Sequence, residues 1–489
     1  MLKAFTLILL SFLMYLSGIK SSEQEFIKES FLEDTVAHDF GNAKVNYANY
    51  CAGCHGEYMK SFADQQYSRD RSKEDLAKAI TNGYPDQGMP SFQKTFSEEE
   101  IDELVGYIWN AMNDVATYDF AKEQFNPRDT FQSEHMIYTL ETVVEGLQHP
   151  WAMAFLPNDD MLITDKIGAL YRLTTDKQLQ AIANVPDVVA KGQGGLMEVT
   201  LHPNFESNNV IYLTYSKQIK SGGKELATTA VHKSRLDGNQ LVDGEDIFVA
   251  LPYSTTRHHY GSRIQFDKDG YLFVSVGDRG NRNRNPQYLD NHCGKIHRLH
   301  DDGSIPEDNP FVNQEGAMPS IYSYGHRNPQ GVVMDPATGK IWEHEHGPRG
   351  GDEINLIEPG VNYGWPTISY GINYNGTSFT DKTKMEGMAQ PKIYWVPSIA
   401  PCGMSFVTGD RYKPWKGHIL TGSLRFKYVN LTTIENDKVT GEEKLLPNVG
   451  RVRAIEMSND DYIYVAVENP GIIYKIVPVG ETPKGEASR

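Results

Sequence analysis

The stretch Trp151–Thr164 (WAMAFLPNDDMLIT) consists of two apolar runs on either side of a short Pro/Asn/Asp turn. Each run has the composition of a β-strand, and the turn residues favour a reversal of the chain. Similar units recur at irregular intervals, so the pattern is an internal repeat rather than a single hairpin. The five further copies span Leu196–Tyr215, Ser262–Val276, Gly331–Glu343, Met404–Thr421 and Val452–Val467.

Six strand–turn–strand units predict an all-β six-bladed β-propeller over residues 136–478. Met136–Val144 is expected to pair with the last strands, near Ile472–Val477, and so close the ring. A pair of β-sandwiches is the alternative fold, but it does not explain six similar units. Residues 479–489 are expected to form a C-terminal tail.

A different pattern precedes the repeats, because residues 43–115 show helical periodicity and predict a small all-α domain. Cys51–His55 reads CAGCH, the spacing at which Cys51 and Cys54 attach haem c through thioethers while His55 binds the iron. Met89, in the stiff turn GMPSF, is the expected second iron ligand. A thioredoxin-like pair or half a zinc site requires neither the His nor the Met. The segment resembles the class I cytochrome c domain along its whole length.

The remaining segments are polar or terminal. Residues 1–22 predict a secretory signal peptide, with Lys3 before the apolar run Phe5–Leu16, and hence a periplasmic or secreted protein. An uncleaved membrane anchor is the alternative, and no later stretch could span a bilayer. Residues 23–42 and 116–135 are expected to be linkers. The net charge of −17 argues against nucleic acid as a partner.

Only four cysteines are present, and two belong to the haem motif. Cys293 and Cys402 are expected to be free thiols near turns of different blades, rather than a disulfide.

The stretch Arg257–Arg263 (RHHYGSR) brings two histidines to the start of an apolar run, and Asp278 follows that run. His259 is therefore a candidate general base with Asp278 as the acid that orients it. The alternative is that His258 and His259 are ordinary polar loop residues. Asp267–Asp278 partly follows the spacing of an EF-hand, but Leu272 stands where a glycine is needed, so that interpretation is rejected.

Three motifs make the propeller recognisable: GHRNPQG (325–331), EHGPRGGDEIN (345–355) and NYGWP (362–366). With these motifs, residues 136–478 resemble the soluble PQQ-dependent glucose/sorbosone dehydrogenase family, in particular its bacterial aldose sugar dehydrogenases. The resemblance implies a propeller that holds pyrroloquinoline quinone (PQQ) and Ca²⁺. It also implies oxidation of the C1 hydroxyl of an aldose to a lactone.

The resemblance assigns roles to individual residues. His259 is the implied base held by Asp278, and Arg327 polarises the quinone together with Ca²⁺. The implied calcium ligands are Gly347, Pro348, Glu353 and Tyr363. PQQ carries three carboxylates, which arginine pairs well. The implied cofactor contacts are Gln193, Arg327, Asn328, Tyr374, Arg425, Arg451 and Arg453. Arg425 replaces a lysine of the family, which keeps the charge but alters the reach.

A tethered cytochrome raises the local concentration of electron acceptor. We therefore expect electrons to pass from PQQ to the chain's own haem c and then to a periplasmic acceptor. Two functions of other classes remain open: a non-catalytic sugar-binding propeller, and a calcium-dependent lactone hydrolase, each fused to a cytochrome c. The sequence also leaves open whether the substrate is an aldose, an oligosaccharide or an aldehyde.

Overall fold

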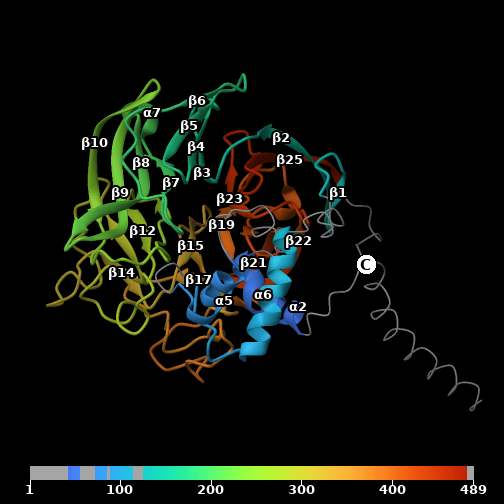
Figure 1. The fold of residues 1–489 in the computed structure, drawn as a ribbon. Helices are drawn as coiled ribbons and strands as arrows, with labels where there is room; N and C mark the ends of the chain where they lie inside the picture. The colour runs from blue at the N-terminus through green and yellow to red at the C-terminus, as the bar shows by residue number, and fades with distance from the viewer. Residues whose placement is uncertain (1–41, 56–71, 85–88, 114–124, 482–489) are drawn as a thin grey trace, which may run out of the picture.

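The computed structural model describes residues 42–55, 72–84, 89–113 and 125–481 (Figure 1). The predicted signal peptide and nearly all of the first predicted linker lie outside these residues. The described chain forms a small helical part followed by six antiparallel β-sheets. No helix within the described ranges is both long enough and apolar enough to cross a membrane.

The first three sheets have four strands each. The first contains β3 (Pro150–Phe155), β4 (Met161–Asp165), β5 (Ala169–Leu173) and β6 (Leu179–Ala181). The second contains β7 (Leu196–Leu201), β8 (Val210–Ser221), β9 (Lys224–Asp237) and β10 (Gln240–Val249), with the short helix α7 (Phe205–Asn208) between β7 and β8. The third contains β11 (Ile264–Phe266), β12 (Leu272–Val276), β13 (Lys295–Leu299) and β14 (Ile321–Tyr324).

The next two sheets repeat this order. The fourth contains β15 (Pro329–Met334), β16 (Ile341–Glu345), β17 (Asp352–Ile357) and β18 (Ile393–Trp395). The fifth contains β19 (Pro401–Phe406), β20 (Ile419–Ser423), β21 (Val429–Glu435) and β22 (Lys438–Leu445), with a 3₁₀ turn at Lys413–Trp415. Each predicted repeat unit corresponds to the first two strands of one sheet, which confirms the six-bladed propeller.

The sixth sheet closes the ring with strands from both ends of the propeller. It contains β23 (Val452–Met457), β24 (Ile463–Val467), β25 (Ile472–Glu481), β2 (Met136–Val144) and β1 (Phe131–Gln132). The pairing of β2 with β25 is the closure that the sequence predicted. Two boundaries differ from the expectation. The predicted linker 116–135 supplies β1, and β25 continues beyond residue 478 because its backbone still pairs with β2.

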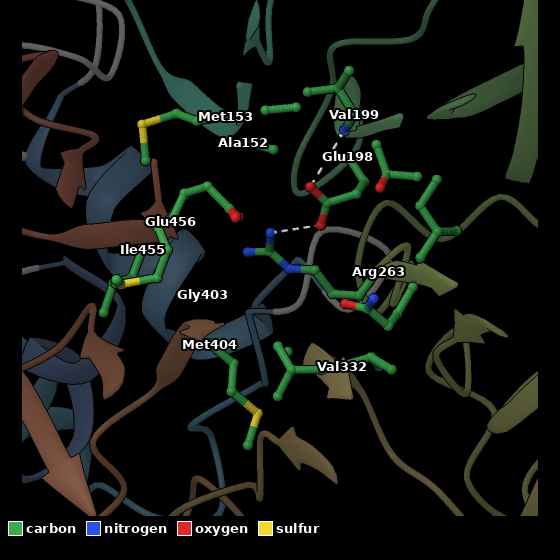
Figure 2. A pocket seen from close by; sticks show the side chains of 18 of the residues that line it. Ala152, Met153, Glu198, Val199, Arg263, Val332, Gly403, Met404, Ile455 and Glu456 are labelled. Carbon is green, nitrogen blue, oxygen red and sulfur yellow. Dashed lines mark hydrogen bonds and ion pairs between the residues drawn. The ribbon is translucent and has the colours of Figure 1, made fainter. Parts of the chain in front are cut away.

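The first strand of each sheet faces a central channel. Residues of β3, β7, β11, β15, β19 and β23 line one end of this channel, which forms a cavity of about 290 Å³ (Figure 2). Arg263 is buried there, and it donates to Glu198 at 2.8 Å and to the carbonyl of Gln330 at 2.8 Å. Its guanidinium also lies 4.0 Å from the centre of the Trp151 ring. The side chain therefore narrows the channel where the six sheets meet.

The helical part contains α2 (Ala43–Asn46), the π-helical turn Tyr47–Cys51, α3 (Ala52–His55), α5 (Lys73–Asn82) and α6 (Glu98–Asn113). Capping boxes begin the two longer helices, as Ser72 pairs with Asp75 and Ser97 pairs with Glu100. Their apolar faces bury a separate small core that includes Leu76, Ile80, Phe92 and Leu104. The helical domain that the sequence predicted is thus present, with the loop of Met89 between α5 and α6.

Candidate functional site

His259 and Asp278 form a buried hydrogen-bonded pair at one end of the third sheet. His259 Nδ1 lies 2.7 Å from Asp278 Oδ1, and the Asp278 side chain is only 1% exposed. The His259 side chain is 13% exposed. Within the described part of the chain, His259 Nε2 has no hydrogen-bond partner. One ring nitrogen is therefore held by a carboxylate, and the other is available to a ligand, which is the arrangement of a general base.

Neighbouring loops fix this pair in place. His259 has a left-handed backbone with φ of 55°, and its N–H donates to Gln193 Oε1 at 2.7 Å. Asp278 Oδ2 accepts from Trp365 Nε1 at 2.8 Å, and its Oδ1 accepts from the N–H of Gly280 at 2.7 Å. Both carboxylate oxygens are thus occupied. Trp365 belongs to the NYGWP motif, but its contact with Asp278 could not be predicted from the sequence pattern.

The protonation of the pair follows from its surroundings. Burial lowers the pKa of His259, and the positive charge of Arg327 lowers it further, while Asp278 opposes both effects. Burial alone would raise the pKa of Asp278, but the charge of His259 and its hydrogen bond hold that pKa well below the usual range. A neutral imidazole beside an ionised carboxylate is the state in which His259 can accept a proton.

A cavity of about 880 Å³ opens in front of His259. On the propeller side its lining includes Gln193, His259, Asp278, Arg327 and Tyr374. His258 also lines it, with its ring edge-on to His259 and its pKa lowered to about 3 by burial. Of the two histidines in the predicted stretch, only His259 has the carboxylate partner.

The same cavity extends into the helical domain. There it is lined by Cys51, His55 and Met89, together with apolar side chains from α5, α6 and the loops beside them. His55 is an intermediate-exposure residue, and burial lowers its pKa to about 4, so the imidazole is neutral and suited to bind iron. The side chain of Cys54 lies outside the described structure. A thiol, an imidazole and a thioether around one apolar cavity fit haem c.

The predicted arginines are not all in this cavity. Of the four, Arg327 alone lines it among the described residues, and its Nη1 donates to the carbonyl of His346 at 2.9 Å. Arg451 and Arg453 both donate to Glu468, at 3.0 Å and 2.6 Å from their Nε atoms. Arg425 donates to the carbonyl of Ser398 at 3.3 Å.

Glu468, which the sequence analysis did not select, therefore pairs with two of the residues expected to bind cofactor. The one sequence feature that could have identified Glu468 is its position directly after the apolar run that forms β24.

Asn328 lies beside the cavity rather than in its lining. Its Oδ1 accepts from the N–H of Gly261 at 3.1 Å, and its own N–H donates to Glu345 Oε2 at 3.2 Å. The residue thus connects the loop of His259 to the neighbouring sheet. Pro348 lines the cavity, and the N–H of Gly347 donates to the buried Asp352 at 2.8 Å. The backbone around the two predicted calcium ligands is held by this bond.

A cluster of buried acids surrounds the predicted ligand Glu353. His326, Glu343 and Glu345 have ligand atoms within 4.8 Å of one another. Asn355 donates to Glu343 at 3.2 Å and to Glu353 at 3.3 Å. Burial and the neighbouring Glu345 raise the pKa values of Glu343 and Glu353 well above the usual range.

Two oxygens in this cluster, Glu343 Oε1 and Asn355 Oδ1, are buried without a hydrogen-bond partner among the described residues. Buried oxygens of this kind fit Ca²⁺. The hydroxyl of Tyr363 donates to the carbonyl of Leu356 at 2.6 Å and accepts from the N–H of Glu358 at 2.9 Å. The Tyr363 hydroxyl oxygen therefore already has two hydrogen-bond partners. His326, Glu343 and Glu345 were not predicted from the sequence. His326 lies in the motif GHRNPQG, and Glu345 begins the motif EHGPRGGDEIN.

Cys293 and Cys402 are both free, as expected, and both are buried. Cys402 is the second residue of β19. Its sulfur accepts from Arg453 Nη1 at 3.1 Å and from Arg263 Nη2 at 3.4 Å.

A propeller with a His–Asp pair in a deep cavity, joined to a helical domain with a CxxCH motif, defines a redox enzyme with its own cytochrome. The chain belongs to the Glucose / Sorbosone dehydrogenase family, whose model matches residues 147–475. A second model, Cytochrome C oxidase, cbb3-type, subunit III, matches residues 39–108. The chain is therefore an oxidoreductase of this family that carries a cytochrome c domain.

Individual relatives agree with the family. The chain is 42% identical to aldose sugar dehydrogenase YliI of Escherichia coli, over 69% of this chain and 92% of that protein. It is 28% identical to quinoprotein glucose dehydrogenase B of Acinetobacter calcoaceticus, over 68% of this chain and 74% of that protein. The crystal structure of the soluble aldose sugar dehydrogenase from Escherichia coli matches with a TM-score of 0.67 and 40% identity, covering 70% of this chain and 100% of that one.

Proposed function

We propose that this chain is a PQQ- and calcium-dependent dehydrogenase that oxidises the C1 hydroxyl of aldose sugars to lactones and passes the electrons to its own haem c. The observation that carries the proposal is the position of His259. His259 lines a cavity that Cys51, His55 and Met89 also line, and its Nδ1 is the ring nitrogen that meets Asp278. The names of the relatives, an aldose sugar dehydrogenase and a quinoprotein glucose dehydrogenase, support the substrate class and the quinone.

The chain's own residues supply acid–base chemistry and orientation. His259 Nε2 accepts the proton of the anomeric hydroxyl, while Asp278 keeps the other ring nitrogen protonated and the ring in place. Arg327 supplies positive charge at the wall of the cavity, where negative charge develops on the cofactor side. Bound PQQ would take the two electrons that leave C1 with the hydride, and haem c would accept them one at a time. Gln193 and Tyr374 line the same cavity and are proposed to contact the quinone.

The proposed calcium sites are two. Gly347 and Pro348 would bind one ion through their carbonyls at the quinone, and the acid cluster at Glu353, with Tyr363 nearby, would hold the other. Arg425, Arg451 and Arg453 are proposed to contact the carboxylates of PQQ. For the last two, this requires that Glu468 share them with the cofactor. Export to the periplasm or outside the cell, with a further acceptor there, completes the proposal.

The test is a visible spectrum of the full-length haem protein loaded with PQQ and Ca²⁺, recorded before and after addition of single aldoses. We expect a sugar to reduce the haem, and we expect this to stop when PQQ is omitted or in His259→Ala. A loaded protein in which no aldose reduces either the haem or an added dye would be a binding or hydrolytic propeller instead, and the proposal would be wrong.

A further inference from the structure

The cytochrome domain contacts the propeller at the mouth of the sugar site. The ring of Tyr50, the residue before the haem-attaching Cys51, lies 4.4 Å from the guanidinium carbon of Arg349. A side chain at Gly376 would come within 3.4 Å of the Tyr50 hydroxyl and 3.5 Å of Arg349 Nη1. Tyr50 itself packs edge-on against Phe92 and Phe96 of the helical core. The contact thus connects the rigid part of one domain to a loop of the other.

The Tyr50–Arg349 contact lies where the haem site of the helical domain and the His259 site of the propeller share one cavity. Residues of both domains line the same space of about 880 Å³, which is within the usual range for a single small-molecule pocket, about 300–1,000 Å³. Under the proposed function, this space would hold the haem, the quinone and the sugar together. Little room remains for the substrate while the domains are in contact.

The cavity at His259 is bounded in part by the cytochrome domain. Its lining includes Tyr50, Tyr84 and Pro90 of the helical domain as well as His259 itself. Arg263 narrows the separate channel between the first strands of the six sheets, whose lining shares no residue with this cavity (Figure 2). A sugar with its C1 hydroxyl at His259 therefore lies in a space that side chains of the cytochrome domain also line.

We propose that the docked cytochrome domain forms one wall of the sugar pocket and restricts the enzyme to monosaccharides. Longer sugars are oxidised only after the Tyr50–Arg349 contact opens. This inference rests on the proposed function, because it requires that the propeller oxidises aldoses at His259. It adds a specificity-determining role for a domain whose expected task is to carry electrons.

The experiment uses the full-length protein with haem, PQQ and Ca²⁺, and a phenazine dye that accepts electrons without the haem. The probes are D-glucose and maltotriose, and the readout is the ratio of their kcat/KM values. Arg349→Ala removes the cation–π contact. Its loss should raise the ratio of undocked to docked molecules about fivefold. Gly376→Trp places a large side chain against Tyr50, at a backbone φ of 82° that the side chain also strains, and should separate the domains further.

The expected result is a low maltotriose-to-glucose ratio in the unmodified protein and a ratio about fivefold higher in Arg349→Ala, with the rate on glucose unchanged. The matched control is Arg411→Ala, which removes a similar contact to Tyr462 at 3.7 Å, outside the cavity lining. Small-angle X-ray scattering reports docking without reference to activity. Arg349→Ala and Gly376→Trp should have larger radii of gyration than the parent protein and Arg411→Ala.

Three outcomes would overturn the inference. The first is a parent protein that oxidises maltotriose as efficiently as glucose. The second is a pair of variants that expand in solution but keep the parental ratio. The third is a pair of variants that do not expand, because the contact would then not hold the domains together. If glucose itself is not oxidised, the proposed function fails instead, and the scattering data still report whether the domains dock.

Discussion

The pairs His259–Asp278 and His326–Glu345 both lie in the described part of the propeller, and they differ in what surrounds the second ring nitrogen. In the pair His259–Asp278, the histidine lines the large cavity, and the nitrogen that does not meet the carboxylate has no hydrogen-bond partner among the described residues. In the pair His326–Glu345, Nδ1 lies 3.4 Å from the carboxylate and Nε2 lies 2.9 Å from the hydroxyl of Ser323. His326 is fully buried and stacks on Tyr363 with 4.7 Å between ring centres.

The comparison shows that the pair itself does not define a base. Both histidines have a carboxylate partner, but only His259 keeps a nitrogen for a ligand. His326, enclosed by Ser323 and Tyr363, is arranged to stabilise the fold or to contribute to a metal site. Mutations of the two pairs should therefore separate catalysis from stability.

The largest effect is expected for His259→Ala. Removing a general base lowers kcat by roughly 10²–10⁴-fold. The melting temperature should change little, because the side chain borders a cavity. Steady-state oxidation of glucose with a dye acceptor and a thermal melt measure the two quantities. A kcat within tenfold of the parent would mean that another residue accepts the proton.

Asp278→Asn should follow, with a kcat lower by about 10²-fold, since the amide cannot hold the imidazole as the carboxylate does. The matched control is Asp246→Asn. Asp246 contacts His232 Nδ1 at 2.9 Å in another blade, away from the cavity. Equal losses of activity in the two variants would contradict a special role for Asp278.

The second pair should respond in stability rather than in turnover. Glu345→Gln removes one charge from the acid cluster, so it should weaken the stabilisation by Ca²⁺. A ligand at 100 times its Kd stabilises a protein by about 2.7 kcal/mol. Chelation should accordingly lower the melting temperature of the parent by a few degrees and that of Glu345→Gln by less. A melting temperature that does not respond to chelation in the parent would argue against calcium in this cluster.

The smallest effect concerns pH. Because burial and Arg327 lower the pKa of His259, the base stays neutral at pH values below the ordinary value of about 6.5. The acid limb of kcat/KM should have its midpoint below that pH. Asp278 raises the pKa of His259, so Asp278→Asn should move the midpoint lower still. A midpoint above pH 6.5 in the parent would contradict the assignment.

The sequence predicted the architecture better than the contacts inside it. Apolar runs around turns identified the first two strands of every blade, because these strands are buried and regular. The outer strands were not identified, since short strands such as β6 and β18 are partly exposed and have no clear period. The boundaries at β1 and β25 depend on pairing between the two ends of the propeller, which local patterns do not show.

The site was also predicted only in part: its central pair was identified, but the partners of the surrounding residues were not. His259 and Asp278 were selected because they flank one apolar run, which folds as the hairpin β11–β12, and the structure brings them together. The surroundings of Arg451 and Arg453 were not foreseen, because their partner Glu468 comes from the far end of β24 and its role depends on the folded sheet. The contact of Trp365 with Asp278 likewise joins residues that are distant in sequence.

The pairing of β2 with β25, which closes the propeller, has a consequence for how the molecule folds. Met136 pairs with Glu481, so the ring cannot close until nearly the whole chain is present. Contacts between distant residues form slowly, whereas the helical domain depends largely on local contacts and can form early. Until closure, β2 and β24 each present an unpaired edge that can pair with another chain. Loss of the last strand would therefore affect aggregation during synthesis before it affected any step of catalysis.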